Sequence, residues 1–112
     1  MNLNRLAAPS LGLIAVLSTA PVSAQEINGN YDGYACQNDF RSQLALDIAW
    51  PVMTYFESSC TVTSSAPGVT NGYIVSCSGE GYEWTGQVVI TRTANGGLIL
   101  NQNGADVTYN RC

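Results

Sequence analysis

One short segment, residues 77–86, holds most of the side chains that could do chemistry. Its two carboxylates, Glu80 and Glu83, could act as the acid and base of a glycosidase. However, the small β-rich chain leaves little room for a sugar cleft, and it contains no histidine and no lysine to shuttle protons or attack a substrate. We therefore expect that the protein is not an enzyme.

The same segment offers no evident site for a metal ion or a cofactor. Gly79 and Gly81 do not predict a phosphate cradle, because no helix follows them and no basic residue is near. Four cysteines without a C-x-x-C pair and without histidine make metal binding by thiolates the weaker interpretation. No cofactor and no metal site are expected.

Residues 77–86 instead have the composition of a binding loop. Ser78 and Tyr82 carry hydroxyls that both donate and accept hydrogen bonds. Gly79 and Gly81 permit a protruding backbone, and Tyr82 and Trp84 are residue types that anchor interfaces. The alternative is a hairpin turn whose aromatic side chains fold back onto the core, and for Trp84 alone we prefer that alternative.

The elements around this loop are short strands. Apolar residues alternate at Leu44, Leu46, Ile48 and Trp50, which is the period of a strand with one buried face. Turn sequences and β-prone runs then divide the chain into about eight strands, near residues 27–36, 44–50, 52–57, 61–63, 72–76, 88–93, 98–101 and 107–109. The sequence predicts an all-β fold, a small antiparallel eight-stranded barrel or a sandwich. The segment 39–45 could instead form a helical turn.

The four cysteines predict two disulfides in an oxidising compartment. Three pairings are possible, and the count of cysteines does not choose among them. If residues 61–63 and 72–76 form a hairpin, Cys60 faces Cys77 and Val62 faces Val75. That register leaves Cys36 to pair with Cys112, which would close the seam of the barrel.

The first 24 residues have the features of an export signal. Arg5 precedes the apolar run 11–17, and the small residues of 22–24 suit a signal peptidase. The run is too short to span a bilayer, and the first cysteine, Cys36, lies too far on for a lipid anchor. We expect a single mature domain of residues 25–112 in the periplasm, without a membrane anchor.

The charge of this mature domain limits its partners. It would contain three arginines and eight carboxylates, for a net charge of −5. Such a surface disfavours nucleic acid and anionic membranes, which bind through lysine and arginine. It is compatible with a basic protein partner or with solubility alone.

Several residues resemble the bacterial periplasmic and membrane-bound inhibitors of c-type lysozyme. Residues 78–82 fit the S-G-x-x-Y motif of that family, residues 34–36 resemble its opening Y-x-C, and Cys112 resembles its C-terminal cysteine. Residues 84–86 look like a shortened form of the aromatic-x-K-G element that follows the motif. This chain lacks the lysine of that element and has the pair Cys60 and Cys77 in addition to the family pattern.

The resemblance implies an exported small β-barrel in which Cys36 and Cys112 are joined. It further implies that the loop of residues 78–82, with its Ser78 and Tyr82 hydroxyls, enters the active-site cleft of a c-type lysozyme. An acidic barrel would be steered toward that basic partner. Glu57, which is distant in sequence from the loop, is expected to have little effect on inhibition. The alternative function is a non-catalytic envelope or carbohydrate-binding domain, with Trp50, Trp84 and tyrosines stacking on sugars.

Overall fold

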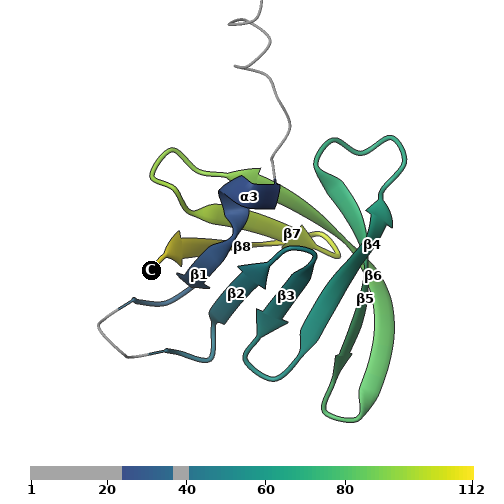
Figure 1. Cartoon of the computed structure of the whole chain (residues 1–112), viewed down its shortest axis with the longest axis horizontal. Coiled ribbons are helices and arrows are strands. Elements are labelled where there is room, and N and C mark those ends of the chain that lie inside the picture. The colour runs from purple at the N-terminus through teal and green to yellow at the C-terminus, as the bar shows by residue number, and fades with distance from the viewer. Residues whose placement is uncertain (1–23, 37–40) are drawn as a thin grey trace, which may run out of the picture.

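Eight antiparallel strands pair in chain order and close into a barrel in the computed structural model, which describes residues 24–36 and 41–112. Figure 1 shows the barrel with the short helix α3 (Ala24–Ile27) at one end. The strands are β1 (Gly29–Asp32), β2 (Ala45–Ala49), β3 (Val52–Tyr55), β4 (Ser59–Ser65), β5 (Gly72–Gly79), β6 (Tyr82–Arg92), β7 (Leu98–Gln102) and β8 (Ala105–Arg111). The predicted all-β barrel with two disulfides is confirmed.

The hairpin register that sequence alone suggested is also confirmed. Cys60 pairs with Cys77 and Val62 with Val75 across β4 and β5, and a disulfide joins Cys60 to Cys77. A bulge follows Val62, which lets β4 bend around the barrel. Both of these cysteines are almost fully buried, so this disulfide forms part of the core.

Alternating side chains of the strands fill the barrel interior. An eight-stranded barrel is just wide enough for side chains to fill it, and the inward positions here are large and apolar. The core consists of Ile27, Tyr31, Leu46, Ile48, Met53, Cys60, Val75, Cys77, Val88, Ile90, Leu98, Leu100 and Tyr109. Within the described residues, no helix is both long and apolar enough to cross a membrane.

Helix α3 and Arg111 seal one end of the barrel. Ile27 is buried in the core, and its carbonyl accepts a hydrogen bond from the Tyr31 hydroxyl at 2.8 Å. The Arg111 guanidinium donates to the Tyr31 hydroxyl and to the backbone carbonyls of Glu26, Asn28 and Gly96. It also lies 4.8 Å from the centroid of the Tyr31 ring. One side chain therefore ties α3, β1 and the β6–β7 turn to β8.

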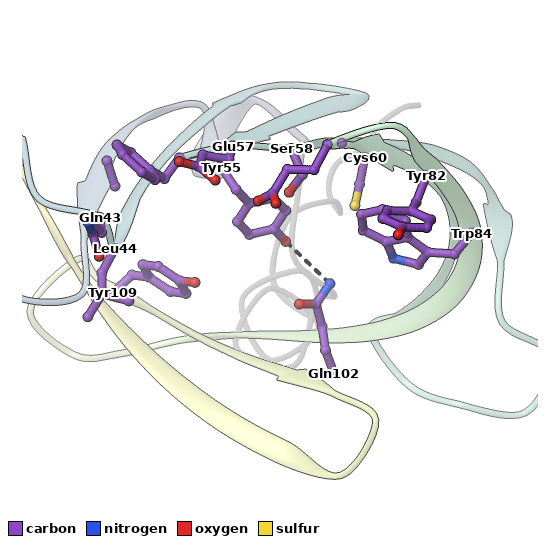
Figure 2. Close-up of a pocket in the computed structure, with 14 residues that line it drawn as sticks. Gln43, Leu44, Tyr55, Glu57, Ser58, Cys60, Tyr82, Trp84, Gln102 and Tyr109 are labelled. Carbon is purple, nitrogen blue, oxygen red and sulfur yellow. Dashed lines mark hydrogen bonds between the residues drawn. The ribbon is translucent and has the colours of Figure 1, made fainter.

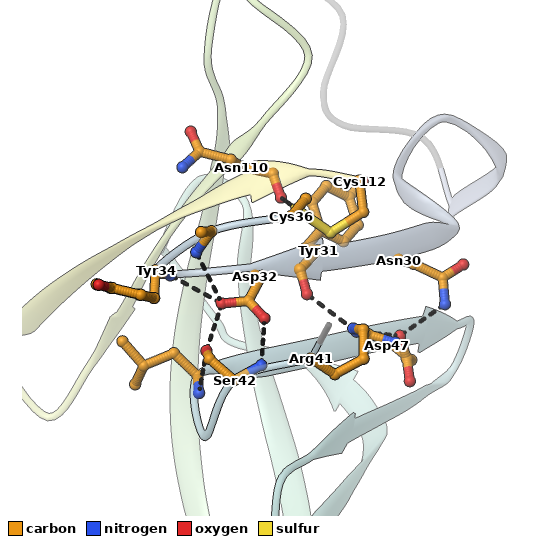
Figure 3. The surroundings of a disulfide bond; sticks show 12 residues. Asn30, Tyr31, Asp32, Tyr34, Cys36, Arg41, Ser42, Asp47, Asn110 and Cys112 are labelled. Carbon is orange, nitrogen blue, oxygen red and sulfur yellow. Dashed lines mark hydrogen bonds and ion pairs between the residues drawn. A yellow bond between two sulfur atoms is a disulfide. The ribbon is translucent and has the colours of Figure 1, made fainter. Parts of the chain in front are cut away.

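The seam between β1 and β8 is short and is reinforced by the second disulfide. Only two residue pairs connect the strands, Tyr31 with Arg111 and Asp32 with Asn110. The predicted Cys36–Cys112 bond is present beyond the end of the ladder, with a Cα–Cα distance of 5.2 Å (Figure 3). It joins the chain after β1 to the end of β8, which agrees with the predicted role in closing the barrel.

Asp32 explains why β1 is shorter than the predicted strand 27–36. Its carboxylate is fully buried and accepts hydrogen bonds from the backbone N–H groups of Tyr34, Ala35 and Ser42 and from the Ser42 hydroxyl (Figure 3). A carboxylate that binds N–H groups two and three residues on bends the chain out of the strand. Burial raises the pKa of Asp32, but these hydrogen bonds outweigh it and leave the pKa below its ordinary value.

Two further expectations concern the ends and loops of the chain. The predicted export signal lies, except for Ala24, outside the described residues. The predicted helical turn at 39–45 lies partly outside them, and residues 41–44 form a turn without helix.

Candidate functional site

The end of the barrel opposite α3 is open and collects four of the chain connections. In an up-and-down barrel, successive turns alternate between the two ends. The β2–β3, β4–β5 and β6–β7 turns therefore lie at the α3 end. The β1–β2, β3–β4, β5–β6 and β7–β8 connections lie at the open end, and the segment 77–86 reaches this end.

The predicted loop of residues 77–86 is instead the tip of a tight β-hairpin. Strand β5 continues to Gly79 and β6 begins at Tyr82, so only Glu80 and Gly81 lie between the strands. Their φ angles are 50° and 85°, which is the two-residue type I′ turn that suits the twist of a hairpin. The prediction of a long loop was wrong because strand pairing extends through residues that looked like turn formers.

Pairing through this hairpin places its candidate residues on two faces. Cys77 pairs with Trp84 and Gly79 with Tyr82, so Trp84 and Tyr82 share the inward face of Cys77. Ser78 pairs with Glu83, and both point to the outer face. The hydroxyls of Ser78 and Tyr82 therefore do not converge, although both are exposed at the tip.

A cavity of about 590 Å³, which we call the cup, opens at this end of the barrel (Figure 2). It is lined by Gln43, Leu44, Ala45, Tyr55, Phe56, Glu57, Ser58, Cys60, Gly79, Glu80, Tyr82, Trp84, Gln102 and Tyr109. Tyr82 is 74% exposed and Trp84 45% exposed. The expectation that Trp84 folds back onto the core was wrong, because its ring lines the open part of the barrel.

The floor of the cup is made of tyrosines and an amide. The Gln102 side chain donates a hydrogen bond to the Tyr55 hydroxyl at 3.4 Å, across the barrel from β7 to β3 (Figure 2). Burial raises the pKa of Tyr55, the nearby Tyr109 raises it further, and the Gln102 hydrogen bond opposes them. Burial also raises the pKa of Tyr109. These phenols stay neutral near pH 7 and present polar hydroxyls in an aromatic cavity.

The rim of the cup carries two carboxylates that interact with each other. A hydrogen bond with Glu80 raises the pKa of Glu57, and the negative charge of Glu80 raises it further. Glu57 belongs to the β3–β4 turn and Glu80 to the β5–β6 turn, so the fold brings together residues that are far apart in the chain. Glu57 was expected, from its distance in sequence, to have little effect on inhibition, but it lines the same cavity as Glu80 and is therefore unsuitable as a control position.

Basic side chains lie elsewhere. Among the described residues that line the cup, none is basic. Arg41 pairs with Asp47 at 2.9 Å and Arg92 with Glu26 at 2.8 Å, while Arg111 seals the opposite end. In the described part of the chain, no group of three or more metal-ligating side chains is placed to hold a metal ion. The cup therefore combines exposed aromatic rings with two carboxylates, and the nearest described arginine, Arg41, lines an adjoining cavity that shares Gln43, Leu44 and Phe56 with it.

Sequence reasoning identified four of the cup residues, Gly79, Glu80, Tyr82 and Trp84, and missed most of the others. Phe56 and Glu57 lie in the β3–β4 turn, Leu44 precedes β2, and Gln102 and Tyr109 belong to β7 and β8. In an up-and-down barrel, alternate turns must lie at the same end, so the predicted strand order already indicated that the β3–β4 and β5–β6 turns are on the same side of the barrel. Which side chains point inward at the rim depends on register, which only the folded barrel supplies.

Comparison of the chain with protein-family models, with curated proteins and with solved structures gave no match.

Proposed function

We propose that this protein is an exported inhibitor of c-type lysozyme. It would act by placing the tip of the β5–β6 hairpin, residues 78–82, in the active-site cleft of the enzyme. Inhibition would come from exclusion of the substrate, without chemistry by the inhibitor. The periplasm is its proposed location, because two disulfides favour an oxidising compartment and the N-terminal sequence is typical of an export signal.

The exposure of Tyr82 carries the proposal. Its side chain is 74% exposed at the end of a hairpin whose turn has only two residues, so a large aromatic ring is held accessible to a partner at the mouth of the cup on a rigid support. Pre-organised aromatic residues are effective anchors, because little conformational entropy is lost when they bind. The S-G-x-x-Y residues occupy this tip, and the Cys36–Cys112 bond has the position that the family resemblance implies.

The two faces of the hairpin refine the mechanism. When the hairpin enters the enzyme's cleft, each of its two faces meets one wall of that cleft. Tyr82, on the face that lines the cup, would contact one wall, and Ser78, on the outer face, would contact the opposite wall through its hydroxyl. Glu80 lines the cup together with Glu57, so its negative charge would have to meet a basic group at the rim of the enzyme's cleft.

The proposal is tested by measuring inhibition of a c-type lysozyme with purified Ser78→Ala and Tyr82→Ala variants. Loss of the Ser78 hydroxyl should weaken inhibition by about 1–3 kcal/mol if it leaves a buried partner unpaired. Loss of the Tyr82 ring should cost about 2 kcal/mol or more. Ser76→Ala is the matched control, because Ser76 is exposed on the same strand but lies farther from the tip and pairs with Thr85.

Thermal melting of each variant separates binding from folding. The Ser78→Ala and Tyr82→Ala variants should melt within a few degrees of the wild type, since both side chains are exposed. If the folded Ser78→Ala and Tyr82→Ala variants both inhibit as strongly as the wild type, the proposed insertion of the hairpin tip is refuted. Failure of the wild type to inhibit any c-type lysozyme would refute the function.

A second candidate is carbohydrate binding in the cup. Exposed rings at Phe56, Tyr82 and Trp84 around a cavity with phenol and amide groups are typical of surfaces that stack on sugars. Titration with chitin and peptidoglycan oligosaccharides, followed through the Trp84 indole N–H signal in NMR spectra, tests it directly. A saturable shift in the absence of any protein partner would favour this candidate over lysozyme inhibition.

A further inference from the structure

The open cup has a chemical character that the hairpin mechanism does not use. We propose that it binds an arginine side chain presented by a protein partner, with the guanidinium between the rim carboxylates and the exposed aromatic rings. This inference goes beyond lysozyme inhibition, because it concerns the cup and any partner with an accessible arginine.

The charge at the rim favours a cation. Glu57 and Glu80 come from two different turns and both line the cup. The two turns are in contact, since a Cβ added at Gly79 would lie 2.6 Å from the Glu57 carbonyl oxygen. Two adjacent carboxylates repel each other when both are ionised, and a cation between them removes that repulsion. The described arginines cannot serve as this cation, since each is bound at another site on the barrel. A cation supplied by a partner would therefore complete the rim.

The aromatic rings favour arginine over a compact cation. Tyr82 and Trp84 project from the same face of β6 into the cup, and Phe56 lies on the turn that carries Glu57. A guanidinium is planar, so it can donate a forked pair of hydrogen bonds to a carboxylate while its face stacks on an aromatic ring. Lysine carries a point charge that is more strongly hydrated and offers no planar surface for stacking.

The size and the floor of the cup fit a side chain that enters from outside. Its volume of about 590 Å³ is within the range of roughly 300–1,000 Å³ that is usual for binding sites. Below the rim, the Tyr55 and Tyr109 rings provide apolar surface for a methylene stem. A neutral sugar could use the aromatic rings but would not use the charge of the carboxylate pair, and this difference separates the two occupants.

The test uses N-acetyl-arginine amide as the probe and its citrulline analogue as the neutral control of nearly the same shape. Binding is followed by NMR through the two indole N–H signals of the intact protein. The Trp84 signal should shift with a dissociation constant in about the millimolar range. The Trp50 signal should stay in place, because Trp50 packs against Tyr73 and its backbone N–H binds Asn28 near the sealed end. Citrulline should bind at least about tenfold more weakly, a difference of about 1.4 kcal/mol.

Charge-neutral variants locate the site. Glu57→Gln and Glu80→Gln should each weaken arginine binding by about five- to tenfold, since each removes one of the two carboxylates. Glu83→Gln is the matched control, because it removes the same charge from the same hairpin but lies on the outer face, opposite Ser78. It should change the affinity less than about twofold. The two rim variants lie in separate turns, so either one remains informative if the other fails to fold.

Three results would overturn the proposal. One is the absence of a Trp84 shift with the arginine probe at tens of millimolar. Another is equal binding of the arginine and citrulline probes, or an effect of Glu83→Gln as large as that of Glu80→Gln. The third is a shift with chitin oligosaccharides alone, which would assign the cup to sugar. None of these measurements contains lysozyme, so failure of arginine binding and failure of lysozyme inhibition are observed separately.

Discussion

Removal of the Cys36–Cys112 disulfide should strongly destabilise the barrel, because this bond closes the longer of the two disulfide loops. The double variant Cys36→Ala/Cys112→Ala opens a loop of 76 residues, whereas the Cys60–Cys77 bond closes only 17. Loop-closure entropy gives roughly 4.5 kcal/mol for the longer loop and roughly 3.1 kcal/mol for the shorter one at 25 °C. The longer loop is the better test, because Cys60 and Cys77 are buried and their replacement would also remove core packing.

Two features of the seam support this large effect. The β1–β8 ladder has only two residue pairs, with one further backbone bond from Cys112 N–H to the Asn30 carbonyl at 2.7 Å. A domain of this size has a total stability of about 5–15 kcal/mol. A loss of about 4.5 kcal/mol would therefore remove a large share of it and leave the barrel closed by few interactions.

The assay is equilibrium unfolding in urea of the wild type and the double variant under identical conditions. The free energy of unfolding should fall by about 4.5 kcal/mol, and the denaturant slope should rise, because the unfolded chain without the cross-link exposes more surface. A loss of less than about 2 kcal/mol with an unchanged slope would refute the reasoning. It would show that the unfolded chain is restrained by something other than this bond.

Two further predictions concern buried polar contacts at the seam and the sealed end. Asp32→Asn should lower the free energy of unfolding by about 2–3 kcal/mol at neutral pH, since the carboxylate accepts four hydrogen bonds. The folded-state pKa of Asp32 lies below its ordinary value of 3.8, so its contribution is present above that value and is lost as pH falls through the folded pKa. As pH falls into the acid range, the free energy of unfolding of the variant should therefore decline less steeply than that of the wild type. Urea titrations at a series of pH values measure this, and an equal decline in both proteins would contradict the prediction. Arg111→Lys should cost about 1–3 kcal/mol, because an ammonium cannot reproduce a fork that reaches three carbonyls and Tyr31. Arg92→Lys, at an exposed ion pair with Glu26, is the control and should cost less than about 1 kcal/mol by thermal melting; equal losses would show that the fork of Arg111 is unimportant.

The sequence determined the fold class because its signals are local. The alternation of Leu46 and Ile48 with polar or small neighbours predicts a strand with one buried face, and both residues are buried in β2. Asn103-Gly104 predicts a two-residue turn, and both residues have positive φ between β7 and β8. The pairing of Cys60 with Cys77 follows from the same period of two, and it leaves one partner for Cys36.

Only the tertiary structure decided the composition of the cup. The residues 79–81 looked like part of a long loop because glycine favours loops, but cross-strand pairing extends β5 and β6 to a two-residue turn. That pairing separates Ser78 from Tyr82 by placing them on opposite faces, and it turns Trp84 into the open barrel. Glu57 and Glu80 line the same cavity because β4 pairs with β5, with Ser59 opposite Ser78, which places the β3–β4 turn beside the β5–β6 turn. Such proximity depends on strand order and register, which are set by the packing of the whole chain and not by any segment of it.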